Sequence, residues 1–171
     1  MSLDIGGRVN EQANDSGLRA ALAELLPELR AFARYLAGSR AEADDLVQEA
    51  VLRTLRGLDG RAEGINLRAW CLAVLRNTFH EQLRLRRREA ARLRNTPEPP
   101  PMAPTQETPG AMRDLTRALA MLPPLLREAV LLVGAQGLSH EEAARICNVP
   151  IGTMKARVSR ARKLLAQNFV P

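Results

Sequence analysis

The sequence predicts an all-α protein with two small helical domains joined by a proline-rich segment. Of its 171 residues 46% are apolar and only 3% aromatic, and alternating β-branched residues that would build a sheet are scarce. Apolar residues recur at helical spacing on both sides of residues 95–110, a stretch with six prolines and no apolar rhythm. A chain of this length holds one ordinary domain or two small ones.

The charge balance favours a polyanionic partner. The formal net charge is +6, and arginines cluster in short stretches, as phosphate contacts require. No run approaches the roughly 18 apolar residues of a membrane span. The start of the chain lacks a basic leader followed by an apolar core. We therefore expect a cytoplasmic protein with no membrane insertion.

Candidate catalytic and metal-binding groups are sparse. Cys71, Cys147, His80 and His140 stand in separate patterns without ligand spacing, which predicts buried or idle side chains. No nucleophile stands beside a base, and no glycine-rich phosphate loop occurs. The sequence predicts a protein that is no enzyme and that has no cofactor, no metal and no small-molecule substrate.

The first domain is expected over residues 17–94, after a polar, mobile tail over residues 1–16. Leucine stripes flank Pro27, which either starts a new helix or kinks a longer one. Gly38 ends this region. Ser39 and Glu42 then form a capping box, the reciprocal pair that starts a helix. Helical spacing predicts a core side made of Ala43, Val47, Ala50, Val51, Thr54 and Leu58, with Leu46 and Leu55 at its edges.

The opposite face of that helix combines acids with an exposed leucine. It holds Asp45, Gln48, Glu49, Leu52 and Arg56. Such a face fits a basic protein surface, because its acids would repel DNA. The alternative is an ordinary wetted helix face with one stray leucine.

A third helix is expected after the glycine-bearing loop 57–66, with Asn66 as its cap. Its first half is apolar nearly all round and must be buried. Asn77 is either a satisfied core hydrogen bonder or the floor of a pocket for a polar group. The second half is cationic and suits a phosphate backbone, although a solvated charge run is the alternative. Its arginines are Arg84, Arg86, Arg87, Arg88, Arg92 and Arg94.

The linker over residues 95–110 is expected to be stiff and extended. At about 3.1 Å per residue it would span on the order of 50 Å, which matches one to two turns of DNA at roughly 34 Å each. Residues 111–168 then predict a second, four-helix domain, whose first two helices support the last two.

The last two helices, within residues 137–167, predict a helix-turn-helix. Ser139 and Glu142 form another capping box, and small residues at 143, 144 and 147 let a second helix cross closely. Asn148 tolerates a left-handed backbone, and Pro150 suits the first turn of the next helix. That helix buries Met154, Val158, Ala161 and Leu165 and turns a slim, basic face outward. This face comprises Gly152, Ala156, Ser159, Arg160 and Lys163, flanked by Thr153 and Lys155.

Three stretches together resemble bacterial RNA polymerase sigma factors of the extracytoplasmic-function type. They are DDLVQEAVLRTL, LRAWCLAVLRNTFHEQLRLRRR and LPPLLREAVLLVGAQGLSHEEAARICNVPIGTMKARVSRAR. The resemblance covers roughly residues 18–93 and 112–167. The segment LVGAQGLSHEEAA is similar to the subgroup that serves the general stress response of alphaproteobacteria.

The resemblance implies roles for three sets of residues. The polymerase-binding set, for the clamp helices of the largest subunit, is Asp44, Asp45, Gln48, Glu49 and Leu52. The set at the promoter −10 element is Asn77, Trp70, Arg84, Arg86, Arg87 and Arg88, with loop 57–66 helping to hold an unstacked base. The set at the −35 element is Lys155, Ala156, Ser159, Arg160 and Lys163, with Arg157 nearer the phosphates. Asn148 replaces the family's usual glycine, and Ala156 lacks its usual hydroxyl.

We therefore expect an alternative sigma factor that binds core polymerase and promoter DNA and acts in a stress response. Because the chain shows no sensor domain, an anti-sigma factor that clamps both domains is the expected control. Two other classes remain open. A dimeric helix-turn-helix regulator would bind a palindromic operator without polymerase, and a sigma mimic would only titrate an inhibitor.

Overall fold

The computed structural model describes residues 5–37, 39–58, 64–93 and 110–168, and every regular element in these ranges is a helix. The N-terminal unit packs α1 (Ile5–Leu36), α2 (Arg40–Gly57) and α3 (Leu67–Leu93) against one another. The C-terminal unit contains α4 (Gly110–Ala120), α5 (Pro124–Val130), the π-helix η1 (Leu131–Ala135), α6 (His140–Cys147) and α7 (Ile151–Asn168). The predicted all-helical class with two helical units is confirmed.

The first helix is longer than the sequence predicted. α1 begins at Ile5, so the backbone of residues 5–16, assigned above to a mobile tail, is helical. Extending a helix is easier than nucleating it, because each further residue adds one hydrogen bond, so a packed segment can carry a polar extension. Pro27 lies inside the helix rather than at a break.

The N-terminal unit is built around α2 and the first half of α3. Ser39 caps α2 by accepting a hydrogen bond from the amide of Glu42 at 3.2 Å, and Asn66 Oδ1 accepts from the amide of Ala69 at 3.1 Å. Leu46, predicted at the edge of the α2 core face, is fully buried. The unit's core also includes Phe32, Ala43, Val47, Ala50, Leu72 and Leu75.

Arg127 of α5 binds the backbone carbonyls at the end of α4 and just after it. The Arg127 guanidinium donates to the carbonyls of Leu119 at 2.9 Å, Ala120 at 2.8 Å and Leu122 at 3.1 Å. These bonds satisfy the end of α4, where carbonyls lack helical partners. Pro124 opens α5 at the first helical position, as proline prefers.

The apolar helix after Pro124 ends in a π-helix that the sequence did not reveal. At its end the amide of Gln136 donates to the carbonyl of Leu131 at 2.9 Å, and that of Leu138 to the carbonyl of Leu132 at 3.1 Å. Gly137 has φ of +67°, the left-handed conformation that lets a helix end in this way. The turn sets the direction in which α6 leaves.

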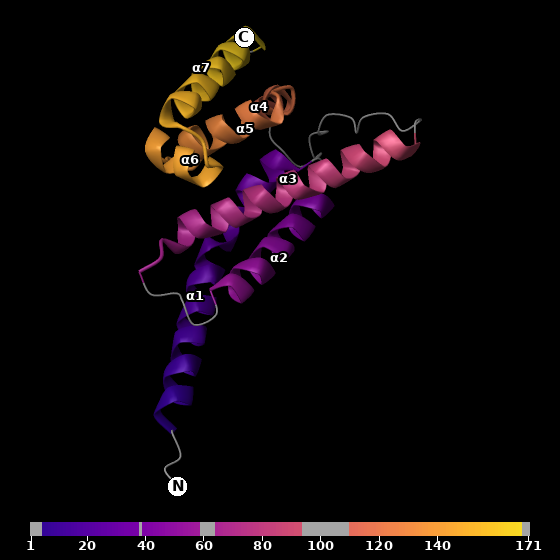
Figure 1. The fold of residues 1–171 in the computed structure, drawn as a ribbon. Helices are drawn as coiled ribbons and strands as arrows, with labels where there is room; N and C mark the ends of the chain where they lie inside the picture. Colours follow the sequence, from indigo (N-terminus) through magenta and orange to yellow (C-terminus); the bar gives the residue numbers. More distant parts are fainter. Residues whose placement is uncertain (1–4, 38, 59–63, 94–109, 169–171) are drawn as a thin grey trace.

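The two units pack together. α6 lies against α3, while α4 and α5 touch α1, and Figure 1 shows the C-terminal helices on the opposite side of α3 from α2. Buried residues of both units form one continuous apolar cluster. The linker, predicted to be stiff and extended, falls on residues outside the described ranges apart from Gly110, which opens α4.

Candidate nucleic-acid and polymerase interfaces

The helix-turn-helix forms as its sequence predicts. Ser139 Oγ accepts from the amide of Glu142 at 3.1 Å, and Glu142 Oε2 accepts from the amide of Ser139 at 2.8 Å. This capping box starts α6, and the hydrogen bond from the Ser139 amide holds the pKa of the Glu142 carboxyl below its usual range. Asn148 has φ of 51° and ψ of 50°, so it takes the predicted left-handed conformation at the corner.

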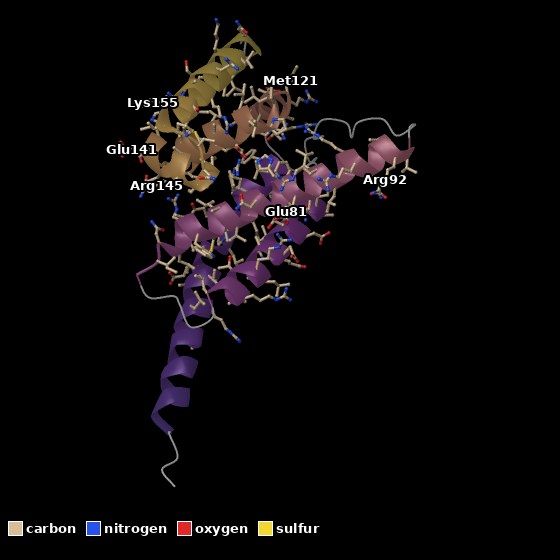
Figure 2. All side chains as sticks on the ribbon, viewed as in Figure 1. Glu81, Arg92, Met121, Glu141, Arg145 and Lys155 are labelled. Atoms are coloured by element: carbon tan, nitrogen blue, oxygen red, sulfur yellow. The ribbon has the colours of Figure 1, made fainter. Side chains whose placement is uncertain are left out.

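The outward face of α7 matches the predicted reading face. Met154, Val158 and Ala161 are buried, and Leu165 is half-buried. The predicted outward residues are all exposed, namely Gly152, Thr153, Lys155, Ala156, Ser159, Arg160 and Lys163. Figure 2 shows Lys155 on the outer side of α7. The helix therefore presents a narrow, cationic surface that fits a major groove.

Arg157 is the exception among the residues predicted for the −35 element, because its side chain turns inward. Its side chain is only 18% exposed, and Nη1 lies 3.6 Å from Oε1 of the fully buried Glu128. A buried carboxylate needs a cation, and at this position of α7 the side chain turns toward α5. Arg157 is therefore engaged within the protein in this conformation, and its place near DNA phosphates stays a prediction.

Glu128 also binds two groups of the N-terminal unit. Arg76 donates from Nε to Oε2 and from Nη2 to Oε1, each at 3.0 Å, and His80 Nε2 lies 2.5 Å from Oε2. Burial by itself raises the pKa of Glu128, but the hydrogen bonds from His80 and Arg76 outweigh it and hold that pKa below its usual range. His80, expected to be buried or idle, is therefore mostly buried and pairs with Glu128.

The residues predicted for the −10 element lie on the exposed part of α3. Asn77 is exposed and accepts from Nη1 of Arg76 at 3.2 Å, which excludes the core alternative. Trp70 is 38% exposed and lies beside the end of α2, where a Cβ on Gly57 would be 3.5 Å from its Cζ2. Part of loop 57–66 lies outside the described residues, so the pocket floor stays a prediction.

The arginines at the end of α3 differ from one another. Arg84, Arg87, Arg88 and Arg92 are exposed, and Figure 2 shows Arg92 at the far end of α3. Arg86 instead pairs with Glu42 of α2 at 2.8 Å. Arg94 lies outside the described ranges. The structure thus keeps most of the predicted cationic end available for phosphate and engages one arginine within the unit.

The face of α2 predicted to bind polymerase is available. Leu52 is 47% exposed, Asp45 and Gln48 are exposed, and Asp44 is half-buried. Glu49 accepts a hydrogen bond from Arg53 Nε at 2.7 Å, so the charge of its carboxylate is partly neutralised within α2. Leu52, Asp44 and Gln48 line a groove of about 720 Å³ between α1 and α2. The opposite wall carries Arg30 and Arg34 of α1, while Arg40 lies at the start of α2; none of these three arginines was predicted for this surface.

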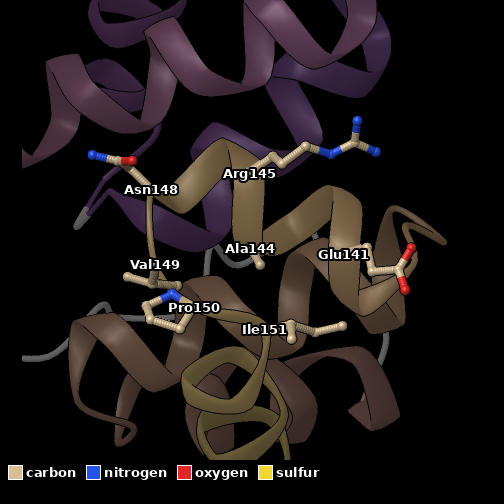
Figure 3. A pocket seen from close by; sticks show the side chains of 7 residues that line it. All are labelled: Glu141, Ala144, Arg145, Asn148, Val149, Pro150 and Ile151. Atoms are coloured by element: carbon tan, nitrogen blue, oxygen red, sulfur yellow. The ribbon is translucent and has the colours of Figure 1, made fainter.

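A second hollow lies at the corner of the helix-turn-helix (Figure 3). Ala144, Val149, Pro150 and Ile151 supply its apolar part, and Glu141, Arg145 and Asn148 its polar part. In Figure 3 the side chains of Glu141, Arg145 and Asn148 point away from one another. One acid and one base leave the hollow without a net charge.

Sequence reasoning missed Glu128 and Arg76. Glu128 stands in the strongly apolar segment LREAVLLV, and an acid in such a helix is buried only with a cation. That signal points to the need for a partner but not to its identity, because Arg76 is 52 residues away in the chain. Among the described residues, no cluster of three or more metal-ligating side chains occurs and no helix is long and apolar enough to cross a membrane.

Two family models match the two units. Sigma-70 region 2 matches residues 22–89, and sigma-70 region 4 matches residues 112–165. The ECF RNA polymerase sigma factor EcfG of Rhodopseudomonas palustris is 43% identical over 150 residues, which cover 87% of this chain and 83% of the relative.

Solved structures agree with this fold. The sigma factor RpoE of Bartonella quintana, solved in complex with the anti-sigma factor NepR, superposes with a TM-score of 0.77 at 40% identity and covers 88% of this chain and 94% of that one. CnrH, solved with the cytosolic domain of CnrY, shares the fold with a TM-score of 0.65 at 22% identity, over 94% of each chain. The chain belongs to the extracytoplasmic-function sigma factors of RNA polymerase, which are specificity subunits and not enzymes.

Proposed function

We propose that the two units of this sigma factor serve two promoter elements. The outward face of α7 reads the −35 element through Lys155, Ala156, Ser159 and Arg160, with Lys163 beside them. The observation that carries this proposal is the division of α7, whose apolar side is buried while every one of these residues is exposed. The proposed domains are residues 17–94 and 111–168, with the linker over residues 95–110.

The −10 element falls to α3 and loop 57–66. Trp70 is exposed near the start of α3 and Asn77 further along it, and Arg84, Arg87 and Arg88 continue along the helix toward the duplex. An exposed amide can hydrogen-bond a base edge, and an exposed indole can stack on a base taken out of its helix. Arg86 joins this set only if it leaves Glu42.

The core polymerase binds the α2 face. Leu52 offers an apolar anchor, and Asp44, Asp45, Gln48 and Glu49 surround it with groups that repel DNA and attract a basic helix. Arg30 and Arg34 of α1, across the groove, suit a partner that carries both charges, because each wall then meets groups of opposite charge.

An anti-sigma factor controls the chain. The support is the likeness to RpoE of Bartonella quintana, which was solved with NepR, and to EcfG of Rhodopseudomonas palustris. We place this chain in the general stress response subgroup on the same ground and on the segment LVGAQGLSHEEAA. The protein therefore acts in the cytoplasm, where the polymerase and the promoter are.

The test is run-off transcription with purified core polymerase on a library of promoter fragments. We expect initiation that depends on this chain and selects both elements. If folded protein and active core give no selective initiation, the proposal fails. Tight binding of the isolated chain to a palindromic operator, without polymerase, would instead support a dimeric regulator.

A further inference from the structure

Glu128 holds side chains of both units at once, although it belongs to the C-terminal unit alone. We propose that this carboxylate is an intramolecular latch, which keeps the free protein closed and must release Arg76 and His80 before the protein can span a promoter. The inference rests on the proposed function, because it uses the assignment of α3 and α7 to two separate promoter elements.

The contact of Glu128 with Arg76 and His80 has a specific geometry. Arg76 meets both carboxylate oxygens at 3.0 Å, the bidentate arrangement that fixes orientation as well as distance. His80 adds a contact of 2.5 Å to Oε2, and Arg157 approaches Oε1 from α7. The carboxylate is fully buried, and the Arg76 and His80 side chains are 14% and 18% exposed. Little water is therefore available to replace these partners while the units remain together.

Two further hydrogen bonds join the two units. Arg68 of α3 donates to the carbonyl of Gln136 at 2.5 Å, beside the turn that leads into α6. Arg127 of α5 donates to the carbonyl of Leu36 at 3.4 Å, at the end of α1. These bonds end on neutral backbone groups. The Glu128 cluster, in contrast, pairs opposite charges away from water. Removing one partner there leaves a buried charge unpaired, which costs free energy.

The closed form ties both reading surfaces to one carboxylate. Asn77 follows Arg76 directly, and Arg157 lies between Ala156 and Ser159 of the α7 face. The two surfaces are thus a few side-chain lengths from a common point. Promoter elements one to two turns of DNA apart, at roughly 34 Å per turn, are beyond that reach. Engagement of both elements therefore requires the units to part.

Parting the units also frees the Arg76 guanidinium. Arg157 stays with Glu128 because both belong to the C-terminal unit, whereas Arg76 and His80 lose their carboxylate. A released arginine beside Asn77 can bind a phosphate with the same bidentate geometry. DNA phosphate and Glu128 then compete for Arg76, so promoter binding itself favours the open form.

The experiment compares the full wild-type chain with Arg76→Ala/His80→Ala by small-angle X-ray scattering at low salt. This double variant removes the contacts between units and keeps the pair of Arg157 with Glu128. We expect unchanged helical circular dichroism and a larger radius of gyration. Arg53→Ala is the matched control, because the partners of Arg53 among the described residues are Glu49 and Glu81, both in the N-terminal unit. This variant should stay as compact as the wild type.

Thiol reactivity of Cys147 gives a second measurement on the same samples. Cys147 is buried on α6 beside Arg76, and burial raises the pKa of its thiol to about 12. In the double variant the rate of modification should rise by about tenfold or more, since loss of a buried ion pair shifts a closed form by at least that factor. His80→Ala alone retains the Arg76 pair and should give a smaller increase, which keeps the test decisive if the double variant misfolds.

Unchanged compactness and unchanged Cys147 protection in both variants would overturn the latch. Neither measurement uses polymerase or DNA, so this failure leaves the proposed function standing. Conversely, if the variants open as expected but the wild type gives no selective run-off transcription, the latch is real and the promoter assignment is wrong.

Discussion

Arg157 and Arg160 stand three residues apart on α7, yet their side chains meet different surroundings. Arg160 is exposed on the reading face, whereas Arg157 lies against buried Glu128. An exposed arginine on such a face is free to make paired hydrogen bonds with a guanine edge. This difference supports the proposal that Arg160 reads a base, whereas Arg157 pairs within the protein.

Arg160→Ala should therefore weaken −35 recognition by about 1–3 kcal/mol and relax base preference. The measurement is competition between matched and single-base variant −35 fragments for holoenzyme. Arg162→Ala is the control, since Arg162 is exposed on the same helix but outside the proposed reading set. Equal losses of discrimination in the two variants would contradict the assignment to Arg160.

Glu128 predicts a specific dependence of stability on pH. The groups that face it are Arg76, His80, Cys147 and Arg157. Its pKa lies below the ordinary carboxyl range, so the unfolded chain binds its proton more readily than the folded chain does. The stabilising contribution is therefore present above the unfolded value of about 4.3 and is lost as pH falls through the folded value.

Glu128→Gln removes that contribution. We expect the variant to be less stable at neutral pH by about 3–5 kcal/mol, because the basic partners stay buried without their acid. The gap should narrow as pH falls toward the lowered pKa. Urea unfolding from pH 7 to pH 3 measures both curves, and parallel curves would show that Glu128 does not titrate as proposed.

Among single residues, the outward set of α7 was predictable, because helical spacing alone decides which side chains share a face. Arg157 was not, since its inward turn depends on a carboxylate in another helix. His80 and Arg76 were missed for the same reason. Pairing across helices leaves no mark in the local pattern of a sequence.

At the scale of one element, α6 depends on its two-sided cap. The Ser139 hydroxyl and the Glu142 carboxylate each satisfy an amide that would otherwise lack a partner. Ser139→Ala should cost about 1 kcal/mol of stability, measured by urea unfolding at pH 7. Ser159→Ala, at an exposed position inside α7, should leave stability unchanged or slightly raised, because alanine is the better helix former. Equal losses in the two variants would count against the cap.

The α2 face offers a second test at this scale. Leu52→Ala should weaken binding to core polymerase by about 1 kcal/mol or more, since an apolar anchor among polar groups is typical of binding hot spots. Leu125 of α5, 43% exposed against 47% for Leu52, is the matched control. Titration of labelled protein with core polymerase measures both. If Leu125→Ala weakens binding as much, the α2 face is not the dock.

Helix starts were the most predictable elements. Ser39, Asn66 and Ser139 each signal their helix within four residues of sequence, and each side chain accepts a capping hydrogen bond. The reciprocal box predicted for Ser39 forms only in half, because the Glu42 carboxylate pairs with Arg86 instead. The helical backbone of residues 5–16 was missed because those residues show no apolar periodicity. The π-helix η1 was missed as well, because its apolar residues fit an ordinary helix equally well.

The whole molecule differs most from its sequence in how the units meet. Composition revealed two helical units and a proline-rich stretch between them, but a linker sequence carries no record of which faces touch. The closed packing depends on apolar residues of both units and on one buried acid with cations from α3 and α7. Such pairings follow from shape and charge in three dimensions.

The carboxylate of Glu128, shared by both units, reduces unregulated transcription initiation. A contact inside one chain does not weaken on dilution, so a newly made copy is restrained even before any inhibitor finds it. If closed molecules outnumber open ones by about tenfold, the polymerase concentration needed to occupy a promoter rises by the same factor. The closed form thus lowers the activity of the subunit in unstressed cells. A partner that binds the closed form needs only to shift further an equilibrium that already favours it.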